Sequence, residues 1–246
     1  MVVWIGIIII GWLLALLVNY FSDVLPFTRT ITKAACHKCD KVIPLSTYLA
    51  LQPCPYCGEK RSGRTWIIQI AFPFALLWIY FYPPSRVGFW LGSLLLVYLL
   101  VIAIIDLEYR VVLYQTTIVG VFIGLSLGYY LHGFQFTIFG GIAGFGIMLI
   151  LYFLGIGFSK LVAQLRHQTE VGVALGFGDV TLAGVLGLIL GWPGILAGLF
   201  LAILLGGLAS GIYLLVLVIL KRYRLFSAIP YAPFLVLGTI ILLYRP

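Results

Sequence analysis

Acidic residues are scarce in this chain of 246 residues. Asp and Glu together number seven, and charged residues of both signs make up 9% of the sequence, against 63% hydrophobic residues. A soluble domain is about one-quarter charged. This composition therefore excludes an ordinary soluble protein and predicts a polytopic membrane protein. The sequence also lacks a low-complexity tract and any internal repeat that we can detect.

Long apolar runs mark the expected membrane helices. A helix needs roughly 20 apolar residues to cross the core of a bilayer. They cover residues 2–21, 66–82, 88–105, 116–131, 134–154, 180–192, 195–220 and 229–244. No basic segment precedes the first run and no small-residue cleavage site follows it, so we expect a retained helix and not a signal peptide. The sequence thus predicts an all-α fold of about eight transmembrane helices.

The basic residues gather in one set of loops. A net charge of +8 would suggest a nucleic-acid partner in a soluble protein. If residue 1 lies outside, however, the loops 22–65, 106–115, 155–179 and 221–228 lie inside and hold thirteen of the fifteen Lys and Arg. The positive-inside rule therefore predicts a multi-pass protein with its N-terminus outside, in contact with membrane lipid and without a nucleic-acid partner.

The expected organisation has three parts. Residues 1–21 form the first transmembrane helix, residues 22–65 a polar cytoplasmic loop, and residues 66–246 a multi-helix membrane domain. Within the last part, we expect the connection 155–179 to be solvated and able to gate access.

All four cysteines fall within the polar loop. They form two CxxC motifs separated by fourteen residues: Cys36, Cys39, Cys54 and Cys57. Two such motifs can present four thiolates to a structural zinc ion with no open coordination position, and Gly58 suits the tight turn after the second. The alternative is two disulfides, which need an oxidising compartment. The cytoplasmic location favours zinc, with His37 a bystander.

Two of the rare carboxylates stand at the ends of apolar runs, on the side predicted to be cytoplasmic. Asp106 ends one run, and Asp179 follows Gly176 and Gly178 at the start of another. An ionisable group at such a position is a functional hypothesis by default. Two carboxylates that meet can share a proton and divide the roles of acid and base, as in an aspartyl protease. The two glycines let the backbone bend and let an extended substrate approach Asp179.

Other interpretations of the carboxylates stay open. Asp179 could be solvated or cap the following helix, and Asp106 could form an ion pair with Arg110 four residues on. A proton- or cation-coupled transporter would place its carboxylates near the bilayer midplane, whereas these lie at segment ends. A protein without catalytic activity that acts as an assembly scaffold would not need two carboxylates at these positions.

The order of the motifs resembles that of the type IV prepilin peptidases, the GxGD aspartyl proteases of the bacterial inner membrane. It comprises a first helix, the double CxxC loop, Ile105-Asp106, Gly176-Phe-Gly-Asp179, and an Ile-Pro-Tyr-Ala-Pro-Phe segment at 229–234. The resemblance implies cleavage of type IV prepilins or pseudopilins after a Gly on the cytoplasmic side, with Asp106 and Asp179 as the catalytic pair. Its further partners would be pilus or secretion assembly proteins.

Several positions depart from the family pattern. Leu113 and Tyr114 replace a Pro followed by Asp or Asn, and Thr181 replaces a common Lys. Residues 43–48 replace a Trp-Tyr-containing stretch between the CxxC motifs, and Gln69 stands where a Glu is expected. Many members also methylate the new N-terminus from S-adenosylmethionine. The last two departures put methyl transfer, and S-adenosylmethionine as a cofactor, in doubt.

Overall fold

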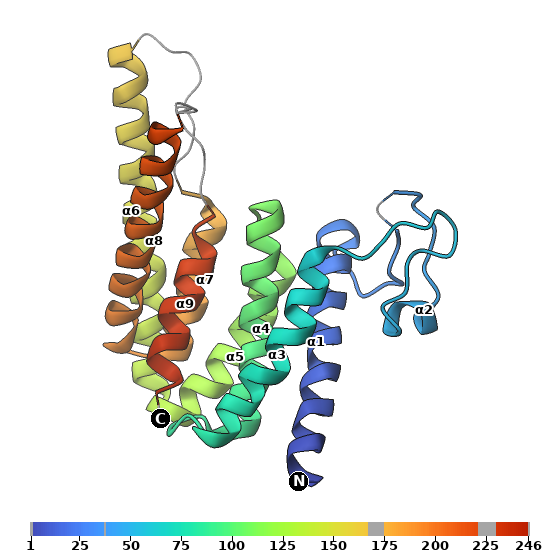
Figure 1. The fold of residues 1–246 in the computed structure, drawn as a ribbon. Helices are drawn as coiled ribbons and strands as arrows, with labels where there is room; N and C mark the ends of the chain where they lie inside the picture. The colour runs from blue at the N-terminus through green and yellow to red at the C-terminus, as the bar shows by residue number, and fades with distance from the viewer. Residues whose placement is uncertain (1, 37, 167–174, 221–229, 246) are drawn as a thin grey trace. The chain divides into compact units, whose positions relative to one another are not determined.

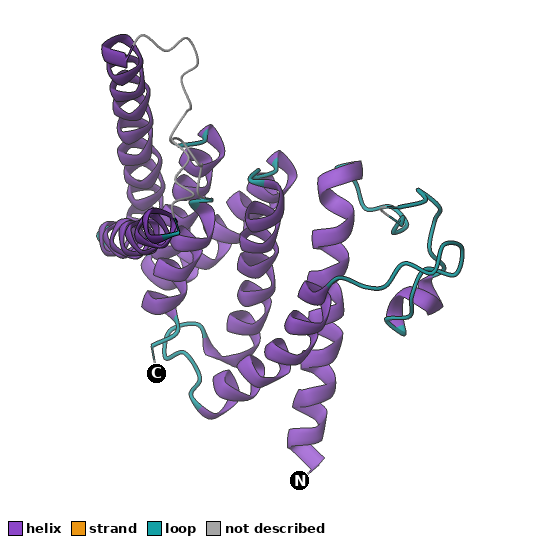
Figure 2. Cartoon of the chain, turned by 45° about the horizontal axis from the view of Figure 1, so that its top comes forward, coloured by secondary structure: helices purple, strands orange, loops and turns teal. Residues whose placement is uncertain are grey.

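The computed structural model describes residues 2–36, 38–166, 175–220 and 230–245, and its regular structure in these ranges is helical (Figure 2). The helices are α1 (Val2–Thr28), α2 (Leu45–Leu49), α3 (Gly63–Phe81), α4 (Gly88–Tyr109), α5 (Tyr114–His132), α6 (Phe134–Arg166), α7 (Phe177–Leu190), α8 (Gly194–Ile219) and α9 (Ala232–Leu243). Outside the helices, an isolated antiparallel bridge joins Ala35 and Val42 in the polar loop. The all-α prediction is confirmed.

The membrane-type helices correspond to the eight predicted runs, although they differ in length. Five are long and apolar enough to cross a membrane: α1, α3, α4, α6 and α8. The apolar helices α7 and α9 are shorter, and α5 begins with polar residues in its first turn. The chain is therefore a multi-pass membrane protein by helix length and composition.

Three helices extend well beyond their predicted ends, the least of them α4, which continues from residue 105 to Tyr109. Helix α1 continues to Thr28, where the sequence predicted a loop from residue 22, and it contains Pro26. Helix α6 continues to Arg166, although we expected a solvated connection from residue 155. Here the glycines at 155 and 157 are followed by good helix formers such as Leu161, so the helix is not interrupted. His37, His167, Glu170, Ile229 and the loop 221–228 lie outside the described residues.

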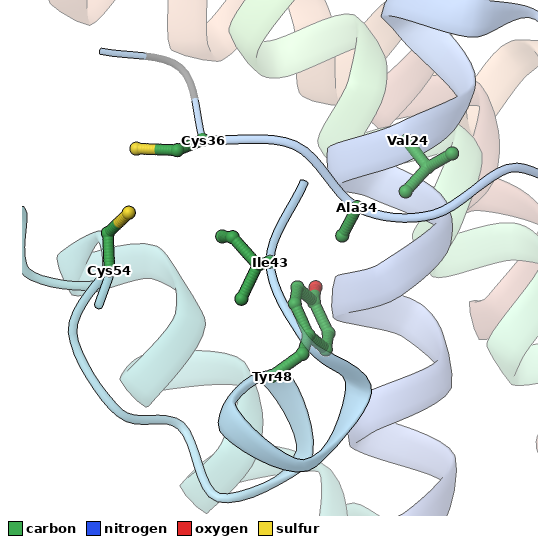
Figure 3. Close-up of a cluster of buried hydrophobic side chains, with 6 residues drawn as sticks. All are labelled: Val24, Ala34, Cys36, Ile43, Tyr48 and Cys54. Carbon is green, nitrogen blue, oxygen red and sulfur yellow. The ribbon is translucent and has the colours of Figure 1, made fainter. Parts of the chain in front are cut away.

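The chain divides into two compact units, which we describe separately. Unit 1 comprises residues 1–105 and 244–246, and unit 2 comprises residues 106–243. In unit 1, α1 packs along α3 (blue and teal in Figure 1). The polar loop packs around a small core in which Val24, Ile43 and Tyr48 are buried together with two of the cysteines (Figure 3).

Helix α7 is the centre of unit 2. It has only fourteen residues, yet it packs against α5, α6, α8 and α9. Nine of its residues are buried, Asp179 among them. Its closest neighbour is α6, where backbone meets backbone: a Cβ added at Gly140 would lie 2.7 Å from the Cα of Gly191. This short apolar helix is thus largely enclosed, because small residues let its neighbours approach.

Candidate active site and candidate metal site

Asp179 lies in the first turn of α7. Its Oδ2 accepts a hydrogen bond of 3.2 Å from the backbone N–H of Gly176, the N-cap residue. A carboxylate is well placed there, since the first N–H groups of a helix lack intrahelical partners. The side chain is only 7% exposed, so the capping interpretation of Asp179 holds but the solvated one does not.

Asp106 lies in the last turn of α4 and is 4% exposed. Its Oδ2 accepts a hydrogen bond of 3.1 Å from the backbone N–H of Ala232, the first residue of α9. Arg110 closes the helix with a backbone bond to the carbonyl of Asp106 and a φ of 55°. No ion-pair contact joins Asp106 to Arg110 among the described residues, although Arg110 still acts electrostatically on Asp106.

Unit 2 brings the two carboxylates within electrostatic range of each other. Each uses its Oδ2 to accept a backbone N–H bond. Neither Oδ1 atom has a hydrogen-bond partner among the described residues, so each carboxylate retains an oxygen for a water molecule or a substrate. The sequence alone gave no sign of the contribution of Ala232, because a backbone donor from 126 residues away leaves no pattern.

Tyr231 is a neighbour of the pair to which we assigned no role from the sequence. It directly precedes Ala232, and its backbone carbonyl accepts the N–H groups of Phe234 and Leu235 at the start of α9. Its hydroxyl interacts electrostatically with Asp179. The motif at residues 229–234 marked the start of α9, where Tyr231 and Ala232 reach the pair, but it did not predict either contact.

The two glycines before Asp179 differ in what they permit. A Cβ at Gly178 would lie 2.8 Å from the Cβ of Val112, which belongs to the non-helical segment between α4 and α5. At Gly176 the nearest atom to an added Cβ is Oδ2 of Asp179 at 3.5 Å, an ordinary contact, and φ is −81°. Gly178 is therefore required by the approach of the segment that follows Asp106, whereas the backbone of Gly176 has an ordinary conformation.

The four cysteines of unit 1 gather into one cluster. The Sγ atoms of Cys36 and Cys57 are 3.5 Å apart, those of Cys39 and Cys54 are 3.8 Å apart, and all four lie within 4.8 Å of one another. The cysteines are free thiols, so the disulfide alternative does not hold here. Tetrahedral zinc with Zn–S bonds of about 2.3 Å separates its sulfurs by about 3.8 Å. The cluster could therefore hold a metal ion of this kind.

The two CxxC motifs share one backbone pattern. In the first, the N–H of Asp40 bonds to the carbonyl of Cys36. In the second, the N–H of Gly58 bonds to the carbonyl of Cys54. Asp40 and Gly58 both have positive φ, 55° and 70°. The turn predicted at Gly58 thus occurs twice. A hydrogen bond from the N–H of Tyr56 lowers the pKa of Cys54 to about 6, whereas desolvation and the neighbouring thiols raise the pKa of Cys57 to about 12, so the four thiols do not all favour the thiolate without a metal.

Gln69, which stands where an acid was expected, is fully buried between α1 and α3. Its Nε2 donates to the carbonyl of Trp12 at 2.8 Å. Its Oε1 accepts from Nδ2 of Asn19 at 3.3 Å, and the same Nδ2 also lies 3.3 Å from the carbonyl of Thr65. The site uses both the donor and the acceptor of an amide, and a carboxylate offers only acceptors.

The fold and the site define a multi-pass α-helical membrane protein with two buried, interacting carboxylates in one unit and four clustered thiols in the other. Residues 93–211 match the model of the type IV leader peptidase family. The resemblance to prepilin peptidases is thereby confirmed over just under half of the chain. A comparison with curated proteins finds no match, and neither does one with solved structures.

Proposed function

We propose that this peptidase is an aspartic endopeptidase that removes the leader of type IV prepilins or pseudopilins, with Asp106 and Asp179 as its catalytic pair. The observation that carries the proposal is the burial of these two carboxylates within electrostatic range of each other in unit 2, inside the segment that matches the leader peptidase family. Burial and mutual repulsion disfavour two charges on the pair, so the two groups would share one proton.

The chemistry follows from one shared proton. The ionised carboxylate would take a proton from the attacking water while the protonated partner donates a hydrogen bond to the scissile carbonyl. The backbone bonds from Gly176 and Ala232 each hold one Oδ2 in place. The two Oδ1 atoms would then face the water and the carbonyl. Because Tyr231 interacts with Asp179 through its hydroxyl, it would lie at the edge of the same reaction site.

The charge asymmetry of the loops supports a location in the bacterial inner membrane with the N-terminus outside. Asp106 and Asp179 would then face the cytoplasm, where a prepilin leader with its short basic segment resides before cleavage. The hydrophobic part of the substrate would pack between helices, which keeps the scissile bond at the membrane boundary. Partners beyond the substrate would be pilus or secretion assembly proteins.

We further propose that the four cysteines bind structural zinc, since their spacing and free thiols suit tetrahedral coordination. The ion would fold a loop too small to draw enough stability from its own core. We propose cleavage without methyl transfer from S-adenosylmethionine. Gln69 supports this restriction because it is a neutral amide with both ends engaged in a buried network.

The test is cleavage of a prepilin by the full-length protein in liposomes, with S-adenosylmethionine present and the product's N-terminus read by mass spectrometry. Replacing Asp106 or Asp179 by Asn should reduce the cleavage rate by at least about 10²–10⁴-fold, the usual contribution of a general acid or base. Asp40→Asn, at an exposed position that tolerates positive φ, is the matched control and should cleave at the wild-type rate.

The outcomes separate the competing functions. Wild-type cleavage in either Asp106→Asn or Asp179→Asn would refute the catalytic pair. An intact substrate with the wild-type protein, across several candidate prepilins, would favour the scaffold function. A product that gains one methyl group would refute the restriction drawn from Gln69.

A further inference from the structure

A cluster of polar side chains lies where α1 nears its end and α3 begins, within unit 1. The hydroxyl of Tyr48 donates to Oδ2 of Asp23 at 2.7 Å, and Nη2 of Arg64 donates to Oδ1 of Asp23. Burial, together with the neighbouring Asp23 carboxylate, raises the pKa of Tyr48, so its hydroxyl stays a donor. Both oxygens of the only carboxylate in this cluster are thereby occupied.

In Arg61, one hydrogen-bonding edge has no partner among the described residues. The centre of its guanidinium lies 4.2 Å from the centroid of the Tyr48 ring. Its Nε and Nη2 are buried and make no hydrogen bond to any described residue. Stacking on Tyr48 uses the flat face of the guanidinium and leaves the in-plane N–H groups unengaged. The Tyr48 ring thus orients two N–H donors of Arg61, and no acceptor among the described residues bonds to them.

The two unmatched nitrogens define the kind of ligand. Nε–H and one N–H of Nη2 point in parallel from one edge of the guanidinium, which matches two oxygens of a carboxylate or a phosphate. The charges favour the same kind of ligand, since the cluster holds two guanidinium groups and one carboxylate, and that carboxylate is paired with Arg64. Glu59, two residues before Arg61, is already paired with Lys38 at 2.8 Å. An added oxyanion would balance the remaining positive charge.

The depth of the cluster favours a lipid as the source of that oxyanion. Arg61 lies two residues before Gly63, where the α3 span begins, and Asp23 lies near the end of the α1 span. An exposed Trp66 follows one turn into α3, as is common where a span meets the headgroup layer. Basic pockets between such helices bind anionic lipid headgroups. Arg61 is part-exposed although its Nε and Nη2 are buried, so a small shift of the guanidinium over the Tyr48 ring would let a headgroup phosphate reach this edge.

We propose that Arg61, stacked on Tyr48 and set beside the Asp23–Arg64 pair, binds the phosphate of an anionic phospholipid headgroup. This site belongs to unit 1, whereas Asp106 and Asp179 belong to unit 2. The proposal therefore does not depend on the peptidase assignment. Bound lipid would tie the polar loop to the ends of α1 and α3.

The experiment uses full-length protein, purified in detergent and stripped of lipid. Binding of short-chain phosphatidylglycerol is titrated by native mass spectrometry for the wild type, Arg61→Lys and Arg29→Lys. Lysine keeps the charge of Arg61 but not the two-pronged edge, so its apparent Kd should rise by about tenfold, in line with the loss of one charge-assisted hydrogen bond. Arg29→Lys makes the same change at an exposed position of the same loop and should leave the Kd unchanged.

Inorganic phosphate alone is the second arm and distinguishes the source of the oxyanion. Thermal stabilisation by phosphatidylglycerol but not by phosphate at the same concentration, and only with Arg61 present, supports the lipid site. Equal stabilisation by phosphate would overturn the lipid assignment in favour of a free anion. Equal lipid affinity in the wild type and Arg61→Lys would overturn the site itself. Unchanged circular dichroism and metal content in each variant establish that the loop is still folded.

Discussion

The two units of this protein rely on different interactions, although both contain a close helix contact; in unit 1, an added Cβ at Gly11 of α1 would lie 2.7 Å from the Cα of Pro73 of α3. In unit 1, polar side chains link the elements: Asn19 and Gln69 join α1 to α3, Asp23 joins α1 to Tyr48 and Arg64, and four thiols close the loop. In unit 2, the backbones approach directly, as where Gly140 of α6 meets Gly187 of α7. Its two buried carboxylates are held by backbone N–H groups.

This difference affects how each unit responds to mutation. Side-chain links can be removed one at a time, and the cost of each is the loss of its own hydrogen bonds or ligands. Contact between backbones has no side chain that can move aside, so one added carbon must push whole helices apart. We therefore expect steric changes to be most damaging in unit 2 and chemical changes to be most damaging in unit 1.

The largest effect is expected for Gly140→Ala in unit 2. The new Cβ would meet the carbonyl oxygen of Gly187 and lie 2.6–2.7 Å from the carbonyl carbon and Cα of Gly191, all backbone atoms. Overpacking of this kind costs typically 1–3 kcal/mol and more where nothing can yield, so we expect about 3 kcal/mol or more. The measurement is the unfolding free energy in detergent, with prepilin cleavage followed in parallel because α7 carries Asp179.

Gly146→Ala is the matched control on the same helix. Nothing lies within 4 Å of an added Cβ there, so only helix propensity changes, and it favours Ala by about 0.5–1 kcal/mol. The two substitutions should shift stability in opposite directions. Equal effects would mean that the close contact of α6 with α7 does not determine the stability of unit 2.

A chemical change in unit 1 is expected to act next most strongly. Cys54→Ser removes one of the four thiols. Loss of a residue that only hydrogen-bonds to a metal ligand already lowers metal affinity by up to about a hundredfold, so the loss of a ligand itself should lower zinc affinity by more. Tyr56→Ser, at an exposed ring within the same CxxC motif, is the control and should keep the ion. Metal content by mass spectrometry decides the matter, and an unchanged stoichiometry in Cys54→Ser would refute the zinc proposal.

The contrast between the units also shows what the sequence could predict. Apolar runs predicted the helices because a membrane span needs a fixed length of apolar residues, and the CxxC spacing predicted the cluster because thiolate geometry is set locally. The ends of α1 and α6 were wrong, since polar residues such as Asp23 and Lys160 do not end a helix when partners or solvent satisfy them.

The surroundings of the carboxylates could be predicted only in part. Asp106 and Asp179 were identified from their positions at the ends of apolar runs, which is a local pattern. The backbone donor of Ala232, the hydroxyl of Tyr231 and the fit of Val112 against Gly178 arise from packing between distant segments. Those contacts follow from the tertiary fold, and no spacing in one sequence encodes them.

A smaller effect, and one that depends on pH, is expected for Gln69→Glu. The amide donates to the carbonyl of Trp12, which an ionised carboxylate cannot do. The variant should lose about 1–3 kcal/mol of stability when charged, the cost of a buried unsatisfied group. Because the new carboxyl is charged in the unfolded chain above about pH 4.3 and is disfavoured as a charge when buried, stability should fall further as pH rises.

The control for this charge is Gln52→Glu, at an exposed position of the polar loop. It makes the same substitution without burial and should unfold at the wild-type temperature across pH 5 to 8. The comparison is read from thermal unfolding in detergent at several pH values. A variant at Gln69 with wild-type stability at high pH would show that the network of α1 and α3 accepts an acid, which would reopen methyl transfer.

The smallest effects should come from the two equivalent turns of the cysteine loop. Gly58→Ala places a Cβ at φ 70°, where nothing else lies within 4 Å, so only the backbone conformation is opposed, at a cost of about 1–2 kcal/mol. Asp40→Gly makes the reverse change at φ 55°. Glycine at this position relieves the left-handed conformation but makes the unfolded chain more flexible, so we expect the folding free energy to change by no more than about 0.5 kcal/mol.

Zinc affinity measured by competition with a chelator should follow the same order, because folding of the loop and binding of the ion are linked. A larger loss in Asp40→Gly than in Gly58→Ala would mean that the Asp40 side chain, and not its backbone, supports the first turn.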